Sequence, residues 1–327
     1  MVISRTPLRV SFFGGGTDLP QWFVNNGGAV ISTTINKYCY VSCKIIPTFL
    51  DYKYRIVYSK QELVKEMKLI EHPGVRESLN FMHQKEPTEV IHSGDLPSRA
   101  GLGSSSSFVV GLIHALYAMK GKTIEKRDLA AQAIFVEQQL IREAVGNQDQ
   151  VAAAHGGFNF IQFDKDGFEV RVFENKNFLN EFNNNLMLFF TKTTRNAFEI
   201  EQSKIDLMAE KISSYHNLLE LTAEALKEMV EPTDLNKIGK LLNEEWLIKK
   251  ELSGKISNKE LDEIHAAGLN AGALGGKLLG SGGGGFMLFY VEPNKQAAVK
   301  EALKHLVNIP FKFENRGSEI IYTNGDI

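Results

Sequence analysis

The sequence predicts an α+β protein of two domains, residues 1–180 and residues 181–327. The chain has 327 residues, of which 43% are hydrophobic, and this supplies a substantial core for each of two domains. Strand-like segments dominate the start of the first half, whereas strands and long helices alternate in the second half. Between the halves the apolar pattern weakens over about residues 165–185, so the boundary is expected there.

Strands are expected early in the first half because its β-branched and aromatic residues are concentrated in short runs. These runs are RTPLRVSFFGG, AVISTTINKYCYVSCKII, YRIVY and TEVIHS. The segment KQELVKEMKLIEHPGVRESLNFMHQ instead has helical spacing of its apolar residues, interrupted at His72, Pro73 and Gly74. We therefore expect two helices in this segment, joined by a turn.

Helices are expected to dominate after the serine run at residues 104–107. The first runs to about Met119, the second is RDLAAQAIFVEQQLIREA and stops at Gly146, and a short third precedes a strand. The second half then reads as the strand NLMLFF, helices over about residues 195–230, 234–252 and 258–271, a glycine-rich loop, the strand FMLFYV, the helix NKQAAVKEALKHLV and the strand FKFEN.

The charge balance argues against nucleic acid or a membrane as partner. Lysine and arginine total 37 against 39 for aspartate and glutamate, so no broad positive field would attract either of them. No apolar run reaches the ~18 residues of a membrane-spanning helix, and the N-terminus lacks a secretory signal pattern. We expect a soluble, cytoplasmic protein in which Cys39 and Cys43 are reduced thiols.

The segment PSRAGLGSSSSF, residues 97–108, places two glycines and four serines at the start of an apolar helix. Backbone N–H groups at a helix N-terminus attract anions, and glycine lets a phosphate come close to the backbone. The serine hydroxyls add donors and an oxygen ligand for Mg²⁺. A plain serine N-cap is the alternative, but it needs only one of these residues. The surplus of small residues favours phosphate binding.

Two familiar phosphate-binding motifs do not explain this segment. A Walker loop needs Gly-x4-Gly-Lys-Ser/Thr, and the Gly121-Lys122-Thr123 stretch has Leu116 at the first glycine position. Further along the chain, the spacing of the dinucleotide-binding fingerprint G-x-G-x-x-G is matched by Gly280, Gly282 and Gly285. The fingerprint requires a strand before the loop and a helix after it, whereas here a predicted helix precedes the loop and a strand follows it.

Three stretches together resemble the GHMP kinases, the superfamily named for galactokinase, homoserine kinase, mevalonate kinase and phosphomevalonate kinase. They are TPLRVSFFGGGTD, LPSRAGLGSSSS and KLLGSGGGGFM, in the order and at the spacing of that family's three motifs. The resemblance covers essentially the whole chain. It implies the two-domain GHMP kinase fold, with an N-terminal β/α domain of ribosomal-protein-like type and a C-terminal ferredoxin-like layered α+β domain. The segments GGGTD and GNQDQVAAAHGG are most similar to bacterial D-glycero-D-manno-heptose 7-phosphate kinases and fucokinase-type enzymes.

The resemblance implies ATP and Mg²⁺ as cofactors. Ser105 and Glu137 would be the Mg²⁺ ligands, and Mg²⁺ does take few ligands from a protein. The alternative for Glu137 is a solvated carboxylate on a helix beside Gln138 and Gln139. The middle motif would hold the ATP phosphates through its backbone N–H groups, at Gly101, Leu102, Gly103, Ser104, Ser105 and Ser106.

Asp149 aligns with the catalytic aspartate of the family, which accepts the proton of the acceptor hydroxyl. Arg9 aligns with the cation beside it, which would keep the carboxylate ionised and offset charge on the transferred phosphoryl group. The alternatives are an aspartate that caps a helix and an arginine in a surface salt bridge.

Thr17 and Asp18 align with the sugar-binding segment of galactokinase. Gly15 and Gly16 replace the Glu-His that usually precedes them, which puts galactose itself in doubt. The third motif would form the opposite wall of the phosphate site, and a flexible hairpin is the alternative although successive glycines are costly in entropy. The wall residues are Gly280, Ser281, Gly282 and Gly283.

Taken together, the resemblance implies an ATP- and Mg²⁺-dependent sugar kinase that phosphorylates the anomeric hydroxyl of heptose 7-phosphate for nucleotide-activated heptose synthesis. Its partner is the small-molecule sugar phosphate. Lys192 and Arg195, in FFTKTTRNAF where a strand ends and a helix begins, are the candidates for binding the 7-phosphate, unless they face solvent. The alternatives are a fucokinase-like enzyme, a non-catalytic sensor of sugar and ATP, and a decarboxylase of the same fold.

Overall fold

A computed structural model describes residues 1–98, 100–193 and 197–324. The larger sheet in this part of the chain has nine strands, and its central path runs β13-β1-β2-β5-β3-β4. Strand β6 pairs with β2, β7 with β6, and β12 with β2. The strands are β1 (Val2–Phe13), β2 (Gly28–Ile45), β3 (Tyr54–Val57), β4 (Gln61–Val64), β5 (Thr88–Gly94), β6 (Phe158–Asp164), β7 (Gly167–Val172), β12 (Phe313–Glu314) and β13 (Glu319–Thr323).

Strand β1 carries a proline at its centre, and the sheet adapts to it. Its antiparallel register with β2 shifts between Pro7 and Leu8. Proline has no N–H to donate to a neighbouring strand, so a central strand tolerates it only at such an irregularity. The remainder of β1 stays paired, and this pairing fixes the position of Arg9 opposite Thr34.

One face of this sheet is covered by helices, of which α3 is the longest. The hydroxyl of Ser4 donates to the carbonyl of Gly111 at 2.8 Å, and the hydroxyl of Ser107 donates to the carbonyl of Pro7 at 2.9 Å. These two bonds fasten α3 to β1. The helical elements of this half are α1 (Pro20–Asn26), η1 (Met67–Leu69), α2 (Pro73–Phe81), α3 (Ser104–Met119), α4 (Lys126–Phe135), the π-helix η2 (Val136–Ile141) and α5 (Gln148–His155).

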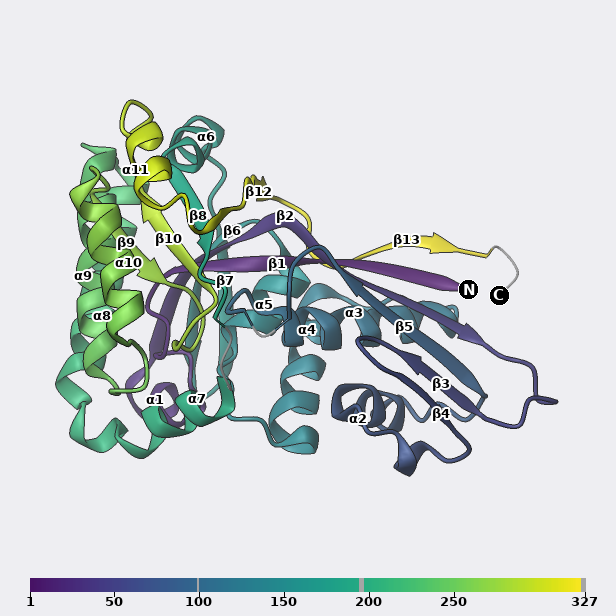
Figure 1. Cartoon of the computed structure of the whole chain (residues 1–327). Helices are drawn as coiled ribbons and strands as arrows, with labels where there is room; N and C mark the ends of the chain where they lie inside the picture. The colour runs from purple at the N-terminus through teal and green to yellow at the C-terminus, as the bar shows by residue number, and fades with distance from the viewer. Residues whose placement is uncertain (99, 194–196, 325–327) are drawn as a thin grey trace.

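The smaller sheet has the strand order β11-β8-β10-β9 within the described residues. Three long helices, α8, α9 and α10, stand at one end of the molecule (Figure 1); α9 and α10 contact strand β9 of this sheet, and α8 packs against α9. The strands are β8 (Leu186–Phe190), β9 (Gly275–Leu278), β10 (Phe286–Tyr290) and β11 (Val307–Asn308); the helices are α6 (Lys176–Asn184), α7 (Ala197–Asp206), η3 (Met208–Glu210), α8 (Ile212–Val230), α9 (Leu235–Glu251), α10 (Lys259–Asn270) and α11 (Gln296–Ala302).

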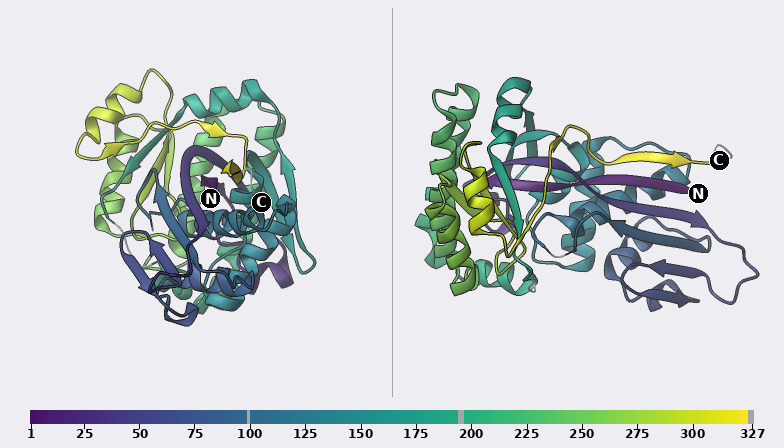
Figure 2. Two further views of the ribbon diagram at one scale, coloured as in Figure 1. Left: turned by 90° about the vertical axis from the view of Figure 1, so that its right-hand side faces the viewer. Right: turned by 45° about the horizontal axis from the view of Figure 1, so that its top comes forward.

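The expected α+β fold of two layered parts is confirmed by the two sheets and their helices. The exact division at residue 180 stays a prediction. The last strands return to the first sheet, because β12 pairs with β2 and β13 pairs with β1. Figure 2 shows this return, with the final yellow strand alongside the purple first strand.

Two expected helical segments differ from the structure. Residues 61–64, expected in a helix, form strand β4, which pairs with β3 in an antiparallel hairpin. The buried carboxylate of Glu62 on β4 accepts the backbone N–H groups of Glu71 and His72, so its role is to hold the chain that leads into α2. The helix expected over residues 195–230 is divided: α7 and α8 are separated by η3.

Within the described residues, no helix is both long enough and apolar enough to cross a membrane. Cys39 and Cys43 are buried, free thiols, as expected.

Candidate active site

The first and third glycine-rich motifs of the sequence come together with the middle motif where the two sheets meet. The backbone N–H of Arg9 on β1 donates to the carbonyl of Leu102 at 3.0 Å. A Cβ added to Gly101 would lie 2.4 Å from the carbonyl oxygen of Leu279, and one added to Gly280 would lie 2.4 Å from the Cα of Gly101. The two loops therefore interlock backbone against backbone, which only glycine permits at both positions.

The predicted wall of the phosphate site is only partly directed at the middle motif. Gly280 meets Gly101, whereas Gly282 and Gly283 rest against Ile256, whose carbonyl accepts the N–H of Gly283 at 2.8 Å. Ser281 is half-buried. Gly280 is thus the member of the predicted set that directly touches the middle motif through backbone contact.

The N-terminus of α3 has the properties of an anion site. Gly103 is its N-cap residue, with φ of 70°, and the backbone N–H of Ser107 donates to the Gly103 carbonyl at 2.9 Å. The amides before Ser107 have no acceptor inside the helix, so they and the helix dipole favour negative charge at this end. This geometry suits the expected contact between the middle motif and phosphate.

Arg9 and Asp149 form a bidentate pair beside this helix end. The Arg9 Nε donates to Asp149 Oδ1 at 2.7 Å and its Nη2 donates to Oδ2 at 2.8 Å. The third donor, Nη1, binds the carbonyl of Gly101 at 2.6 Å. The arginine is 4% exposed, which rules out the surface salt bridge that was its alternative. Arg9 therefore connects Asp149 to the loop of the middle motif.

Two opposing effects act on the Asp149 carboxyl. Burial raises its pKa above the ordinary value, and the Arg9 guanidinium counteracts this while Asp18 adds to it. The net direction is upward, so Arg9 offsets the cost of desolvation only in part. A carboxylate with a raised pKa is a stronger proton acceptor, which is the property that a general base needs.

Glu137 lies at the start of a π-helix, a distortion frequently found at functional sites. Its side chain is fully buried, so it is not the solvated carboxylate that was its alternative. Burial, with the neighbouring Glu143, raises its pKa to about 8, against the opposing hydrogen bonds from Ser106 and Gln150. The carboxyl is therefore costly to keep charged unless a cation accompanies it.

The serine that meets Glu137 is Ser106 and not Ser105. The Ser106 hydroxyl donates to Glu137 Oε2 at 2.8 Å, and Gln150 donates to the same oxygen. Ser105, one residue earlier, is exposed. Successive residues of an α-helix point about 100° apart, so Ser105 is turned away from Glu137. The expected Mg²⁺ contact of Ser105 stays a prediction, and in this structure the hydroxyl that reaches Glu137 is that of Ser106.

The residues around Glu137 fit a Mg²⁺ ion. Glu137 Oε1 is buried and has no hydrogen-bond partner among the described residues. With the Ser106 hydroxyl, it offers hard oxygen donors of the kind that Mg²⁺ prefers. Groups of three or more His, Cys, Asp or Glu side chains that could hold a metal are not found in the described part of the chain. Only an ion that shares its remaining ligands with phosphates and water suits such a sparse site.

The expected sugar-binding pair has a different arrangement from the one predicted. Thr17 is fully buried, and its hydroxyl donates to the carbonyls of Gly14 and Ala29 and accepts the N–H of Ala29. It fastens the loop to β2, so its hydroxyl is engaged within the protein, and the sugar contact of Thr17 stays a prediction that this geometry does not favour. Asp18 accepts the backbone N–H of Gly16 at 2.9 Å and that of Gln148 at 3.2 Å. This places Asp18 next to the segment that carries Asp149.

The predicted phosphate clamp receives little support from geometry. Lys192 is exposed, with φ of 60°. Arg195 lies outside the described residues.

Sequence reasoning assigned no role to Lys249 and Glu245, although both are buried beside the third motif. The Lys249 ammonium donates to the Gly280 carbonyl at 2.6 Å. Glu245 pairs at 3.1 Å with Lys277, the first residue of that motif. Their four-residue spacing in EEWLIKKE reads as an ordinary solvated helix face, and only the packing of α9 against β9 shows that this face is covered.

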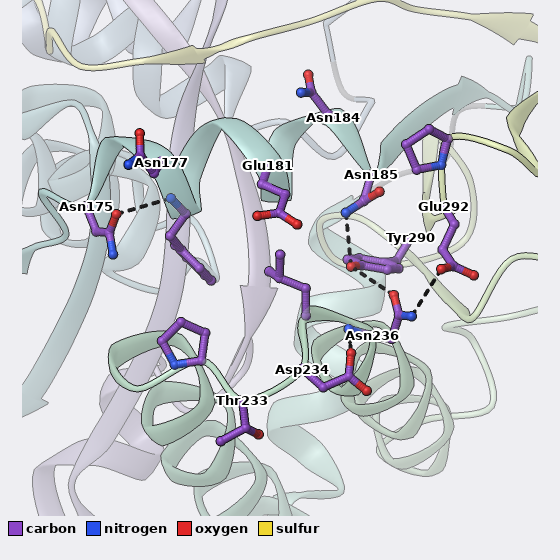
Figure 3. A pocket seen from close by; sticks show the side chains of 14 residues that line it. Asn175, Asn177, Glu181, Asn184, Asn185, Thr233, Asp234, Asn236, Tyr290 and Glu292 are labelled. Carbon is purple, nitrogen blue, oxygen red and sulfur yellow. Dashed lines mark hydrogen bonds between the residues drawn. The ribbon is translucent and has the colours of Figure 1, made fainter.

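A pocket of about 660 Å³ lies apart from these residues, between α6, α9 and the end of β10. Hydrogen bonds run from Asn185 to Tyr290, from Tyr290 to Asn236 and from Asn236 to Glu292 (Figure 3). Among the described residues that line it there is no lysine or arginine, and Glu181, Asp234 and Glu292 add negative charge. An anionic nucleotide is not expected to bind there.

Comparison with known proteins assigns the family. The profile of the GHMP kinases N terminal domain matches residues 63–157, and that of the GHMP kinases C terminal matches residues 222–308. The chain is 32% identical over 320 residues to the D-glycero-alpha-D-manno-heptose 7-phosphate kinase of Campylobacter jejuni, and the match covers 92% of both chains. It is 24% identical to the bifunctional fucokinase/GDP-fucose pyrophosphorylase of Arabidopsis thaliana over 89% of this chain and 30% of that longer protein.

Solved structures share the fold. A crystal structure of a D-glycero-D-manno-heptose 1-phosphate kinase from Bacteroides thetaiotaomicron superposes with a TM-score of 0.81 at 22% identity, covering 99% of this chain and 100% of that one. A crystal structure of a mevalonate kinase gives a TM-score of 0.72 at 19% identity, covering 97% of this chain and 100% of the other. The matches in sequence and fold show that this chain belongs to the GHMP kinases, which use ATP as phosphoryl donor.

Proposed function

We propose that this sugar kinase transfers the γ-phosphoryl group of ATP to the anomeric hydroxyl of D-glycero-D-manno-heptose 7-phosphate. The product is the 1,7-bisphosphate, a precursor of nucleotide-activated heptose for a capsule or lipopolysaccharide. The observation that carries the proposal is the 32% identity to a heptose 7-phosphate kinase over 92% of both chains. The reaction belongs in the cytoplasm, where ATP is available.

The residues around Arg9 support a direct transfer mechanism. Asp149 accepts the proton of the sugar hydroxyl as that oxygen attacks the γ-phosphorus, and the raised pKa of its carboxyl favours this step. Arg9 holds the carboxylate by two hydrogen bonds and the Gly101 carbonyl by a third, which aligns the base with the phosphate loop. The amides at the start of α3 bind the phosphates. Ser106 and Glu137 would hold Mg²⁺, which when bound neutralises phosphate charge.

On the acceptor side, Asp18 is proposed to hydrogen-bond the sugar hydroxyls. Each of its oxygens receives one backbone N–H, which fixes the carboxylate and leaves further lone pairs available. Lys192 and Arg195 remain the proposed clamp for the 7-phosphate, on the strength of their position after β8 in the sequence.

A fucokinase-like activity on a free sugar is the second candidate. It is favoured by the 26% identity to the L-fucokinase/L-fucose-1-P guanylyltransferase of Bacteroides fragilis over 92% of this chain, which spans 35% of that protein. A non-catalytic sensor is disfavoured because the Arg9–Asp149 pair and Glu137 are all retained. A sensor needs neither a proton acceptor nor its guanidinium partner.

Acceptor specificity provides the first test. The value of kcat/KM for heptose 7-phosphate is expected to exceed that for free heptose and for L-fucose by on the order of 10², since charge-assisted hydrogen bonds to a phosphate contribute roughly 1.5–3 kcal/mol each. A coupled assay of ADP release measures all three acceptors. Arg195→Ala should lose about tenfold on the phosphorylated acceptor alone, while Arg171→Ala, an exposed arginine on β7, serves as control. Equal use of free sugars would replace this assignment with the fucokinase-like one.

The metal ligands can be tested with two neighbouring serines. Ser106→Ala and Glu137→Gln should each raise the Mg²⁺ concentration for half-maximal rate by at least roughly tenfold, since even loss of a residue that only hydrogen-bonds to a metal ligand typically costs 10–100-fold in metal affinity. Ser105→Ala is the matched control, because that hydroxyl is exposed. Mg²⁺ titrations at fixed ATP and saturating sugar measure the effect. A shift in Ser105→Ala with none in Ser106→Ala would restore the original assignment.

A further inference from the structure

Two buried lysines lie behind the phosphate site, on α9 and β9. Lys249 is 3% exposed and Lys277 is 1% exposed. Lys277 donates to the carbonyl of Phe12 at 2.5 Å and to Glu245 at 3.1 Å. Lys249 donates to the carbonyls of Gly280 at 2.6 Å and Leu278 at 3.5 Å. Both ammonium groups thus hold backbone segments that build the site.

The charges of these lysines are not equally compensated. Lys277 has Glu245 as counter-ion, whereas no ion pair joins Lys249 to a carboxylate in residues 1–98, 100–193 and 197–324. Lys204 offers a comparison, because it is also 3% exposed but pairs with Glu201 at 2.6 Å. A buried ammonium held only by carbonyls is costly unless an anion accompanies it. The position of Lys249 therefore calls for a negatively charged ligand.

This ligand would bind beside the junction of the two glycine-rich loops, because the loops leave no space between Gly101 and Gly280 themselves. Gly280, whose carbonyl Lys249 holds, packs on Gly101, and the Gly101 carbonyl is held by Arg9. Only two backbone residues therefore separate the ammonium of Lys249 from the guanidinium that holds Asp149. In a kinase, the anions that reach such a junction are phosphoryl groups.

We propose that Lys249 binds a phosphoryl group of the reactants, as a cation additional to Arg9. The inference rests on the kinase function and deepens it. The phosphoryl group has two sources, the one that ATP transfers and the one already carried by the acceptor. Both present the same anionic oxygens, and the acceptor comparison below separates them.

Binding of a phosphoryl group at Lys249 should be measurable as proton uptake, because of the charges that surround this lysine. Burial, followed by Lys277 on β9 and Lys204 on α7, lowers its pKa well below the ordinary value, while Glu245 on α9 and Glu201 on α7 oppose this. An arriving phosphate favours the charged form. Binding should therefore take up protons, which a lysine that only supports the Gly280 loop would not cause.

The test compares neighbouring lysines on one helix. Lys249→Met keeps much of the apolar stem and removes the charge, and Lys250→Met is the matched control because its ammonium pairs at 3.1 Å with Asp262 on the surface. Calorimetry with a non-hydrolysable MgATP analogue, with and without acceptor, in two buffers of different ionisation enthalpy measures affinity and proton uptake together. Lys249→Met should bind about tenfold more weakly, for one lost charge-assisted bond, and take up fewer protons than Lys250→Met and wild type.

Kinetics then identify the source of the phosphoryl group. An equal loss of kcat for phosphorylated and free acceptors points to the transferred group, and a loss confined to phosphorylated acceptors points to the group that they carry. Wild-type affinity, kcat and proton uptake in Lys249→Met would overturn the proposal. Recovery of these values in Lys249→Gln, which is neutral but can still donate to the Gly280 carbonyl, would also overturn it in favour of a purely structural role. A wild-type protein that binds no nucleotide would refute the kinase function itself.

Discussion

Asp149→Asn is expected to lower kcat by roughly 10²–10⁴, the range for loss of a positioned general base. The carboxylate receives two N–H donors from Arg9, at 2.7 and 2.8 Å. An amide in its place presents one oxygen and one NH₂ group, so one of the two arginine donors loses its acceptor and the proton-accepting lone pair is lost as well. Nucleotide affinity should stay near that of wild type, because the α3 amides that bind phosphate are unchanged. Stopped assays of ADP formation and calorimetric titration with an ATP analogue measure the two quantities.

The acid side of the pH profile gives an independent readout. The base acts in its deprotonated form, so kcat/KM of the wild type should fall as the pH drops through the pKa of Asp149, which burial raises above its ordinary value. In Asp149→Asn the residual rate should lack this limb. A profile that keeps the limb in the variant would assign it to another group.

Arg9→Ala tests whether the two side chains act as a unit. Its kcat loss should not add to that of Asp149→Asn, because either change already breaks the bidentate pair. Arg5→Ala is a suitable control, since Arg5 lies on the same strand and its ion pair with Glu319 is about 30% exposed on both sides. Additive losses in the double variant would mean that Arg9 and Asp149 act separately, and near-wild-type turnover of Asp149→Asn would remove that residue from the mechanism.

The parts of the fold that could be predicted from sequence are those governed by local rules. The glycines of PSRAGLGSSSSF do precede a long helix whose first residues are the serines, and Gly103 has the positive φ that glycine accommodates. The contacts of Arg9 could not be predicted from local pattern, because Arg9 is 92 positions from Gly101 and 140 positions from Asp149 in the sequence. Only the resemblance of three motifs, in order, to those of a known family predicted that these residues come together.

Local rules failed where a distant partner decides the outcome. Residues 61–64 have helical spacing, but pairing with β3 and the burial of Glu62 stabilise a strand there. The side chain that meets Glu137 depends on the rotation of α3, which buries Ser106 against Glu137 and leaves Ser105 exposed. Lys249 has no sequence signal at all, because lysines in a charged helical segment are usually solvated. Only tertiary packing shows that its ammonium is covered.

The second large effect is expected for Gly280→Ala. Gly280 has φ of 72°, and its added Cβ would lie 2.4 Å from the Cα of Gly101. The left-handed backbone alone costs an L-residue about 1–2 kcal/mol, but the contact with backbone is the larger problem, because neither loop has a flexible side chain that could yield. The loops must separate, which shifts Gly101 and with it the carbonyl that orients Arg9. A displacement of about 1 Å at a reacting centre can cost roughly 10² in rate, so kcat/KM for ATP should fall by at least that factor.

Stability should fall as well in Gly280→Ala, but the protein should stay folded. The left-handed backbone and the contact with Gly101 together should lower the free energy of unfolding by about 2–4 kcal/mol, less than the roughly 5–15 kcal/mol that stabilises a native protein. Gly254→Ala is the matched control: no heavy atom lies within 4 Å of its added Cβ, and the residue follows α9 in the same half of the chain.

Gly101→Ala should reproduce the loss of activity, and the losses in the double variant should be less than additive, because either change alone already forces the same two loops apart. Full nucleotide affinity in both single variants would show that the interlocked loops are not needed to shape the phosphate site, and the role of the third motif would then lie with the carbonyls that Lys249 holds.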